Sequence, residues 1–251
     1  MTQTAQPVAP ARAPVTPRPR RGRRSLRLVL LIAVAIAVPL AGVGVLWPLT
    51  PSVSDAEQRI TARLDQHSAH DPHALAVPDK VGVAVVATED SRFFSHHGLD
   101  ALGVVRALWG FAHGSADPGG ATLDQQLAKN LYTSDSVLAK VEQVELSFKL
   151  EAQYSKPQIL EMYLSEVYYG HGFYGLPAAA RGLFGVAPSD LSWAQASLLA
   201  GLVQAPSAYD PYRHRDLAKQ RQRHVLDRLT ATHTLTPAQA AAAYAAPLNL
   251  R

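Results

Sequence analysis

Two adjacent carboxylates, Glu89 and Asp90, are the residues whose types and spacing most directly suggest chemistry. They follow the small, apolar run 81–88 (VGVAVVAT), so both lie at the edge of a segment that is expected to be buried. Burial and a neighbouring like charge both disfavour ionisation of a carboxyl group, and proteins use these effects to prepare general acids and bases. The pair could also simply cap a helix, and spacing alone leaves both interpretations open.

Further motifs change the balance between these interpretations. The string 89–98 (EDSRFFSHHG) resembles the E-D-x-x-F-x-x-H-x-G signature of peptidoglycan glycosyltransferases, the transglycosylases found alone or in class A penicillin-binding proteins. The block 119–130 (GGATLDQQLAKN) is similar to the family's G-G-S-T-x-x-Q-Q-x-x-K-N. Residues 156–170 (KPQILEMYLSEVYYG) and 221–226 (RQRHVL) resemble two later motifs. The resemblance extends over about residues 80–230.

The resemblance implies a reaction and roles for these residues. The substrate would be lipid II, a disaccharide-pentapeptide on undecaprenyl pyrophosphate, and the product a glycan strand. Glu89 matches the general base of an inverting displacement, and Asp90 would orient its surroundings in the catalytic site. The pyrophosphate and sugars would contact a larger set of residues, namely Phe93, His96, Gly98, Thr122, Gln126, Lys129, Asn130, Lys140, Gln143, Lys156 and Arg221.

No cofactor is required by this chemistry, although a divalent cation, Mg or Mn, could bridge the pyrophosphate through oxygen ligands. No certain metal site is predicted. His96 and His97 are adjacent and therefore point to different faces, and the His67, His70 and His73 spacing is interrupted by Pro72, which favours a solvated loop. The chain has no cysteine, so thiolate sites and disulfides are excluded.

The family's third motif, R-K-x-x-E, falls on residues 139–143 (AKVEQ), where only Lys140 is retained. Gln143 replaces the carboxylate and can form hydrogen bonds but cannot supply a charge. Ala121 and Ser165 are smaller departures. Two alternatives to polymerisation therefore stay open: a weakened or inactive member that binds lipid II or nascent glycan, and a lytic transglycosylase or muramidase that cleaves glycan.

The N-terminal part indicates a membrane protein. Residues 1–27 contain seven arginines and no acid, while the rest of the chain has 17 Lys and Arg against 20 Asp and Glu. This mildly acidic body argues against a nucleic-acid partner. The apolar run 28–48 is long enough to cross a bilayer, and the basic flank before it predicts a cytoplasmic N-terminus and an external catalytic domain. A cleaved signal peptide is the alternative.

The expected fold is mainly α-helical and, by resemblance, a lysozyme-like two-lobe domain preceded by a single transmembrane helix. A disordered tail (1–27) and the span lead through a connector (49–80) to the glycosyltransferase domain (81–235). Helices are expected near 55–64, over 134–154, over 192–204 behind a capping box, and in the C-terminal part, 236–251. The apolar stretch 101–111 could dip into membrane lipid or pack in the core.

Two further expectations concern function outside the site. The chain stops at Arg251, which leaves no room for a transpeptidase module, so the protein is expected to polymerise glycan without cross-linking peptides. Proteins of a cell-wall synthesis complex are expected as partners, although no motif specifies them.

Overall fold

The computed structural model describes Val34 and residues 47–67, 79–112, 121–133 and 139–251, with the backbone alone for 107–112. In this part of the chain the regular structure is helical, and strand-like pairing is limited to two isolated bridges, His97 with Leu99 and Tyr168 with Tyr174. The mainly α-helical fold class is thus confirmed. The elements are α2 (Ala56–Gln66), α3 (Lys80–Glu89), η1 (Phe93–Ser95), α4 (Ala101–Ala112), α5 (Leu123–Tyr132), α6 (Ala139–Gln153), α7 (Lys156–Glu166), α8 (Leu176–Phe184), η2 (Pro188–Asp190), α9 (Trp193–Leu202), α10 (Arg215–Ala231) and α11 (Pro237–Ala245).

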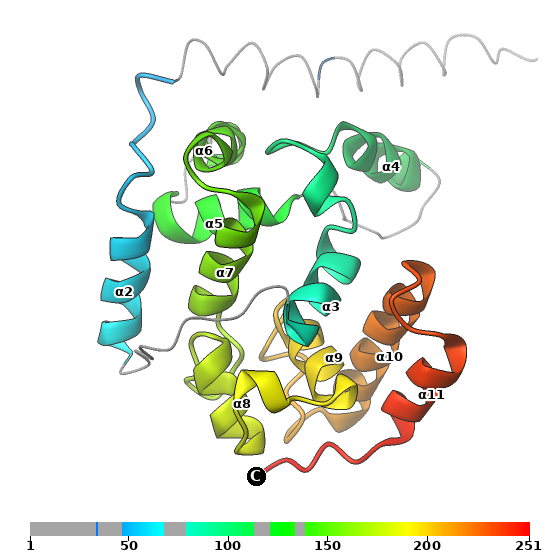
Figure 1. Cartoon of the computed structure of the whole chain (residues 1–251). Coiled ribbons are helices and arrows are strands. Elements are labelled where there is room, and N and C mark those ends of the chain that lie inside the picture. The colour runs from blue at the N-terminus through cyan, green and yellow to red at the C-terminus, as the bar shows by residue number, and fades with distance from the viewer. Residues whose placement is uncertain (1–33, 35–46, 68–78, 113–120, 134–138) are drawn as a thin grey trace, which may run out of the picture.

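Helix α3 is the central element of the domain. It packs against α9 and α10 on one side and against α7 on the other, as Figure 1 shows. Its side chains are small and apolar nearly all round, which suits a helix covered on several faces. Asp79 starts it by accepting the backbone N–H of Gly82 at 2.5 Å. The helix ends at Glu89, so the predicted base is the last helical residue before the chain turns.

A second group of helices faces α3. Helices α5 and α6 pack on each other, both contact α7, and α2 packs against α5 and α7 (Figure 1). Ile60 of α2 is buried in the same core as Leu127 of α5 and Leu160 of α7. Burial of such side chains contributes about 1.5–3 kcal/mol each. This packing holds α5 and α6, which contain the second and third motifs, against α7, which carries the motif at 156–170 and itself packs on α3.

Several predicted helix boundaries are confirmed and others move. The capping boxes of Ser192 with Gln195 and of Thr236 with Gln239 are both formed, and they start α9 and α11. The C-terminal helix ends at Ala245 rather than near the chain end, because Ala246 precedes Pro247 and takes an extended conformation. Residues 134–138 of the predicted third-motif helix lie outside the described residues.

The membrane expectation concerns residues that the structure mostly leaves undescribed. Of the predicted span 28–48, only Val34, Trp47 and Pro48 are described. No described helix is both long enough and apolar enough to cross a membrane. In α4, Leu102 is 65% exposed, which leaves an apolar side chain available to lipid. Val105 is half-buried, and the side chains of the later apolar residues of this stretch, Leu108, Trp109 and Phe111, lie outside the described part.

Candidate active site

Glu89 forms an ion pair with Arg221 of α10. The Arg221 Nη2 donates to Glu89 Oε1 at 2.6 Å, and the two side chains are 11% and 16% exposed. Gly201 of α9 gives the arginine stem its space, since a Cβ at that position would lie 3.0 Å from Arg221 Cγ. A guanidinium beside a carboxylate favours the charged carboxylate, which is the form that accepts a proton. The geometry therefore presents Glu89 as a partly exposed carboxylate held in place by a cation.

Asp90 points into the protein and connects the first motif to the second. Its carboxylate oxygens accept from His96 Nε2 at 3.0 and 2.9 Å, and Oδ2 also accepts from the backbone N–H of Leu123 at 3.1 Å. Asp90 is 6% exposed and His96 is 9% exposed. Both residues thus lie beneath the site, where they tie the end of α3 to the start of α5. This placement agrees with an orienting role for Asp90.

The carbonyl oxygen of Gly98 is a meeting point of three donors. It accepts from Thr122 Oγ1 at 2.9 Å, Gln125 Nε2 at 3.1 Å and Ser147 Oγ at 3.1 Å. Thr122 also begins α5 by capping the N–H of Gln125. Gly98 has φ +64°, and a Cβ there would lie 3.0 Å from the Ser147 hydroxyl, so glycine is required on both counts. Gly98 and Thr122 are therefore structural supports of the first two motifs.

Two lysines predicted to hold pyrophosphate lie near each other on α5 and α6. Lys129 and Lys140 are both exposed, and Lys140 Nζ donates to Gln125 Oε1 at 3.2 Å. The Lys140 side chain as a whole is exposed, but its ammonium group is partly desolvated, and this desolvation and then the positive charge of Lys129 lower the pKa of Lys140. Two neighbouring ammonium groups repel each other, and an anion bound between them relieves that repulsion. The pair is suited to a diphosphate.

Gln126 and Tyr163 connect this polar wall to the base. The Tyr163 hydroxyl of α7 donates to Gln126 Oε1 at 2.8 Å. Burial and, next, the negative charge of Glu89 raise the pKa of Tyr163 well above its ordinary value. Tyr163 is thus a neutral phenol placed between the carboxylate and the α5 amides. Sequence reasoning did not select Tyr163, although it lies inside the fourth motif.

Lys156 lies in an internal charge network with Asp124 and Glu151. Its ammonium is 3.1 Å from Asp124 Oδ2, pairs with Glu151, and lies 4.2 Å from the ring centre of buried Phe93. Burial raises the pKa of Asp124 to about 6 despite the nearby lysine. Burial alone would also raise the pKa of Glu151, but hydrogen bonds from Lys156 and the Gly98 N–H lower it. Lys156 and Phe93 thus support the site from below.

Asp90, His96 and Asp124 form a buried group whose possible ligand atoms lie within 4.8 Å of one another. Its donors fit a cation poorly. Asp90 already accepts from His96 and from the Leu123 N–H, and the ammonium of Lys156 lies beside Asp124. A dication there would have to displace a protein cation and two hydrogen bonds. We therefore assign this group to positioning of the helices rather than to metal binding.

The residues of the altered third motif differ in their exposure to solvent. Lys140 is exposed and reaches Gln125, whereas Gln143, one turn further along α6, is 9% exposed. Glu142 is half-buried, while Glu145 is 1% exposed. Burial is compatible with an amide at position 143, because a neutral side chain loses less solvation than a carboxylate.

Asn130, predicted to contact substrate, donates instead to a buried carboxylate at the end of α7. Its Nδ2 lies 2.6 Å from Glu166 Oε1, and Arg63 Nη1 of α2 lies 3.2 Å from Oε2. Burial raises the pKa of Glu166 to about 7, and the hydrogen bond from Asn130 and the charge of Arg63 only partly oppose this. Glu166 thus joins α2, α5 and α7 through a group that titrates near neutrality.

This titration predicts how stability depends on pH. Because burial raises the folded-state pKa of Glu166 from its ordinary value of 4.5 to about 7, the folded protein retains a proton that the unfolded chain releases. The contribution to the free energy of unfolding is complete below pH 4.5 and is lost as pH rises towards 7, by up to about 3 kcal/mol. Glu166→Gln is expected to flatten this part of the profile in urea unfolding between pH 4.5 and 8. Glu161→Gln on the same helix is the control, and identical profiles for both variants would contradict the assignment.

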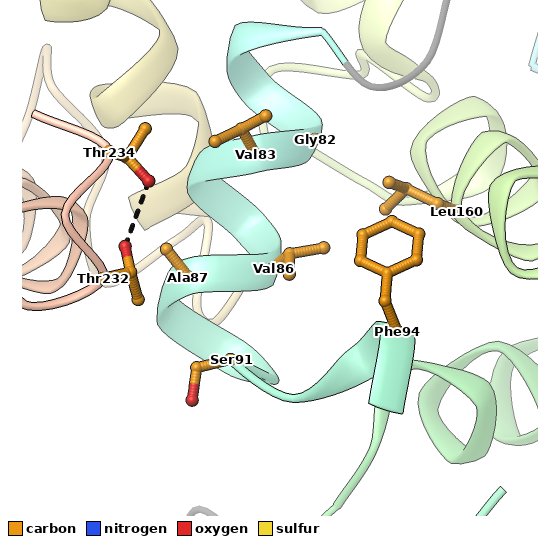
Figure 2. A pocket seen from close by; sticks show the side chains of 9 residues that line it. All are labelled: Gly82, Val83, Val86, Ala87, Ser91, Phe94, Leu160, Thr232 and Thr234. Atoms are coloured by element: carbon orange, nitrogen blue, oxygen red, sulfur yellow. Dashed lines mark hydrogen bonds between the residues drawn. The ribbon is translucent and has the colours of Figure 1, made fainter. Parts of the chain in front are cut away.

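An apolar cavity of about 190 Å³ lies on another face of α3 and is shown in Figure 2. Phe94 and Leu160 form one side, and Thr232 and Thr234, hydrogen-bonded to each other at 3.1 Å, form the other. The rest of the lining comes from α3 and from a residue two positions beyond its end: Gly82, Val83, Val86, Ala87 and Ser91. No charged side chain lines the cavity, so it is unsuited to a pyrophosphate, and Glu89 is not part of it.

The predicted site residues therefore divide into two groups. Glu89, Gln126, Lys129 and Lys140 keep partial or full exposure and can meet a substrate. The others lie beneath them or bind protein groups, namely Asp90, Phe93, His96, Gly98, Thr122, Asn130, Gln143, Lys156 and Arg221. Sequence reasoning missed Gln125, Tyr163, Asp124 and Glu151. Asp124, Gln125 and Tyr163 lie within the motifs given above, which was the only signal for them.

The chain is similar to several penicillin-binding proteins. It is 38% identical over 177 residues to penicillin-binding protein 1F of Bacillus subtilis, covering 69% of this chain and 25% of that protein. It is 39% identical over 175 residues to penicillin-binding protein 1A of Vibrio cholerae, covering 68% and 21%. The chain thus spans about a quarter of the length of these relatives. A solved structure of penicillin-binding protein 1A from Haemophilus influenzae matches 51% of this chain and 16% of that one, at 27% identity and a TM-score of 0.37.

The family comparison covers the helices that build the site. The model of the transglycosylase family matches residues 57–230, from the start of α2 almost to the end of α10. Glu89, the two lysines and Arg221 all lie within that range. The match also begins well before residue 81, where the sequence placed the start of the catalytic domain, and so includes α2. This chain belongs to the transglycosylase family.

Proposed function

We propose that this protein polymerises peptidoglycan glycan strands from lipid II by inverting glycosyl transfer. The observation that carries the proposal is Glu89, a partly exposed carboxylate held by Arg221 at 2.6 Å on the same helical framework as the Lys129 and Lys140 pair. A base and an anion site are the two groups that this reaction needs. Family membership supports the general activity, peptidoglycan glycosyl transfer.

In the proposed reaction, Glu89 accepts the proton of the acceptor sugar's 4-hydroxyl. The hydroxyl oxygen attacks the anomeric carbon of the donor sugar from the face opposite the pyrophosphate. The bond between that carbon and the pyrophosphate oxygen breaks, and its electron pair leaves with undecaprenyl pyrophosphate. Lys129 and Lys140 stabilise the charge that develops on the leaving group, and preorganised cations of this kind give large rate effects.

Membrane attachment is part of the proposal. The apolar run 28–48 with its arginine-rich flank supports a single span with a cytoplasmic N-terminus and an external catalytic domain. Exposed Leu102 on α4 supports contact between the domain and lipid. A divalent cation, Mg or Mn, would arrive with the pyrophosphate, because the buried Asp90 group is already satisfied by protein donors. Nascent glycan and cell-wall synthesis proteins are the proposed partners, and the two-lobe shape and the lack of peptide cross-linking stay predictions.

The experiment is polymerisation of labelled lipid II by the detergent-solubilised full chain, with glycan length read on gels. Wild type is expected to make long strands, and Lys129→Ala to lower the rate by about 10²-fold through loss of a charge-assisted contact to the leaving group. Lys219→Ala, on α10 beside Tyr244, is the matched control and is expected to keep the wild-type rate.

Two outcomes would favour the other functions. An absence of polymer from wild type with recovery in Gln143→Glu would identify a binding protein that has lost a catalytic carboxylate. Shortening of preformed glycan strands without polymerisation would identify a lytic enzyme. Equal rate losses in Lys129→Ala and Lys219→Ala would remove the lysine pair from the proposed anion site.

A further inference from the structure

Lys149 of α6 holds the chain segment that follows the N-terminal apolar run. Its Nζ donates to three backbone carbonyls, of Trp47 at 2.8 Å, Thr50 at 2.8 Å and Pro51 at 3.1 Å. An ammonium group has three donors, so these three bonds use all of them. Lys149 is 8% exposed. A buried lysine whose three donors all bind carbonyls of one short segment is a clamp, because hydrogen bonds from a charged group are stronger than those between neutral groups.

The clamped segment is fixed at its other end as well. Val53 is 3% exposed, and its carbonyl oxygen lies 3.2 Å from the hydroxyl of Tyr154 and 3.3 Å from that of Tyr132. Tyr132 also donates to Asp55 at 2.9 Å, at the start of α2. Pro48 and Pro51 restrict the backbone between these points. Residues 47–55 therefore form a stiff junction along α6 and α2 rather than a loose linker.

Two apolar side chains at the start of this junction point outward while its backbone is held. Trp47, near the end of the apolar run 28–48, is 42% exposed, and Leu49 is 75% exposed. The Trp47 ring centre lies 5.2 Å from Lys149 Nζ, so the indole is held beside the clamp. An exposed tryptophan next to a leucine at the end of a membrane-length apolar run is typical of the interface between lipid and water.

Helix α6 connects this junction to the site. Lys140, part of the proposed anion site, is nine residues before Lys149 on the same helix, which corresponds to roughly 13 Å along the axis. A helix transmits displacement without bending over that length. Any change in the position of Trp47 relative to α6 thus changes the position of the anion site relative to the bilayer.

We propose that Lys149 is a positioning residue that fixes the height and orientation of the active site above the lipid surface by locking the Trp47–Pro51 backbone to α6. The exposed side chains of Trp47 and Leu49 contact the bilayer at the interface between lipid and water. This inference rests on the membrane attachment in the proposed function. A lipid-linked substrate presents its pyrophosphate at one depth. A catalytic domain held at a fixed height above the bilayer therefore places Lys129 and Lys140 at the level of that pyrophosphate.

The test measures the depth of Trp47 in vesicles of phosphatidylglycerol and phosphatidylcholine. The full chain with Trp109→Phe and Trp193→Phe leaves Trp47 as the single tryptophan, and lipids brominated at different acyl positions quench it according to depth. We expect shallow, narrowly distributed quenching. Lys149→Met keeps an unbranched side chain of about the length of the lysine stem and removes its donors, and it is expected to shift or broaden the depth profile. Lys80→Met, which removes a single bond to the Leu191 carbonyl, is the control and should leave the profile unchanged.

Activity gives a second readout that a merely structural role would not reproduce. Lys149→Met is expected to raise the apparent KM for lipid II in vesicles by about tenfold, the value of one lost contact of 1.4 kcal/mol, and to leave kcat and activity in detergent micelles near wild type. Tyr154→Phe, a milder change at the same junction, is also expected to raise the apparent KM in vesicles. It replaces Lys149→Met in the test if that variant does not fold.

Three results would overturn the inference. They are no quenching of Trp47 in the native protein, unchanged depth in both junction variants, and equal loss of activity in vesicles and micelles. Depth quenching needs no catalysis, so it separates this inference from the proposed function. A depth shift in a protein that makes no polymer would keep the clamp and reject the polymerase.

Discussion

Glycan polymerisation by Glu89→Gln is expected to fall by about 10²–10⁴-fold, the usual contribution of a general base. Glutamine has nearly the same shape and its Oε1 can still accept from Arg221, which now donates at 2.6 Å, so the fold should be retained. What is lost is the ability to take a proton from the acceptor hydroxyl. Initial rates with labelled lipid II measure the loss, and the thermal midpoint of unfolding checks the fold.

The control for this variant is Glu57→Gln, which changes an exposed acid in the first turn of α2. Its rate is expected to stay within about twofold of wild type, since exposed substitutions rarely alter a distant site. A Glu89→Gln protein that polymerises at the wild-type rate would reject the base assignment. Equal losses in both variants would point instead to an unspecific effect of net charge.

Arg221→Met is expected to have the second-largest effect, through both stability and pH dependence. Breaking a buried ion pair leaves one charge without its partner and costs about 3 kcal/mol, the lower end of the usual range because both side chains keep some exposure. Without the guanidinium, Glu89 binds protons more readily. The acid side of the pH–rate profile is therefore expected to move to higher pH, and rates measured between pH 5 and 9 would show this.

The matched control is Arg223→Met, two residues further along α10. Arg223 is exposed, and its guanidinium carbon lies 4.0 Å from the Tyr244 ring centre, on a different face of the helix from Arg221. It should leave the pH–rate profile in place. A shift of equal size in both variants would mean that the general field of α10, rather than the pair with Glu89, sets the pH dependence.

Local features of this protein could be predicted from sequence, because a few neighbouring residues determine them. The capping boxes at Ser192 and Thr236 are formed as predicted, since each needs only a residue and its third successor. The family motifs also predicted that Glu89 and the lysines belong to one site, and this stays a prediction. Pro247 also carries a local signal, because the residue before a proline disfavours the helical conformation. This signal alone predicts that α11 ends before Pro247.

Pairings across the fold could not be predicted in the same way. Arg221 was expected to touch substrate, and its actual partner is Glu89, on a different helix. Nothing in the motifs shows that the Gly98 carbonyl collects three donors or that Lys156 is shared by two carboxylates. Such contacts depend on which helix faces pack together. The periodicity of a single sequence shows which face of a helix is buried, but not which other helix covers that face.

The pair of Glu89 and Arg221 has a consequence for the order in which the protein matures. The two residues are 132 positions apart, so they meet only after α10 has been synthesised and packed on α3 and α9. Contacts of such long sequence separation form late, because the chain between them must be closed first. A chain interrupted before Arg221 would carry the base without its cation. Under the proposed function, a partly synthesised chain that lacks α10 is therefore expected to be inactive.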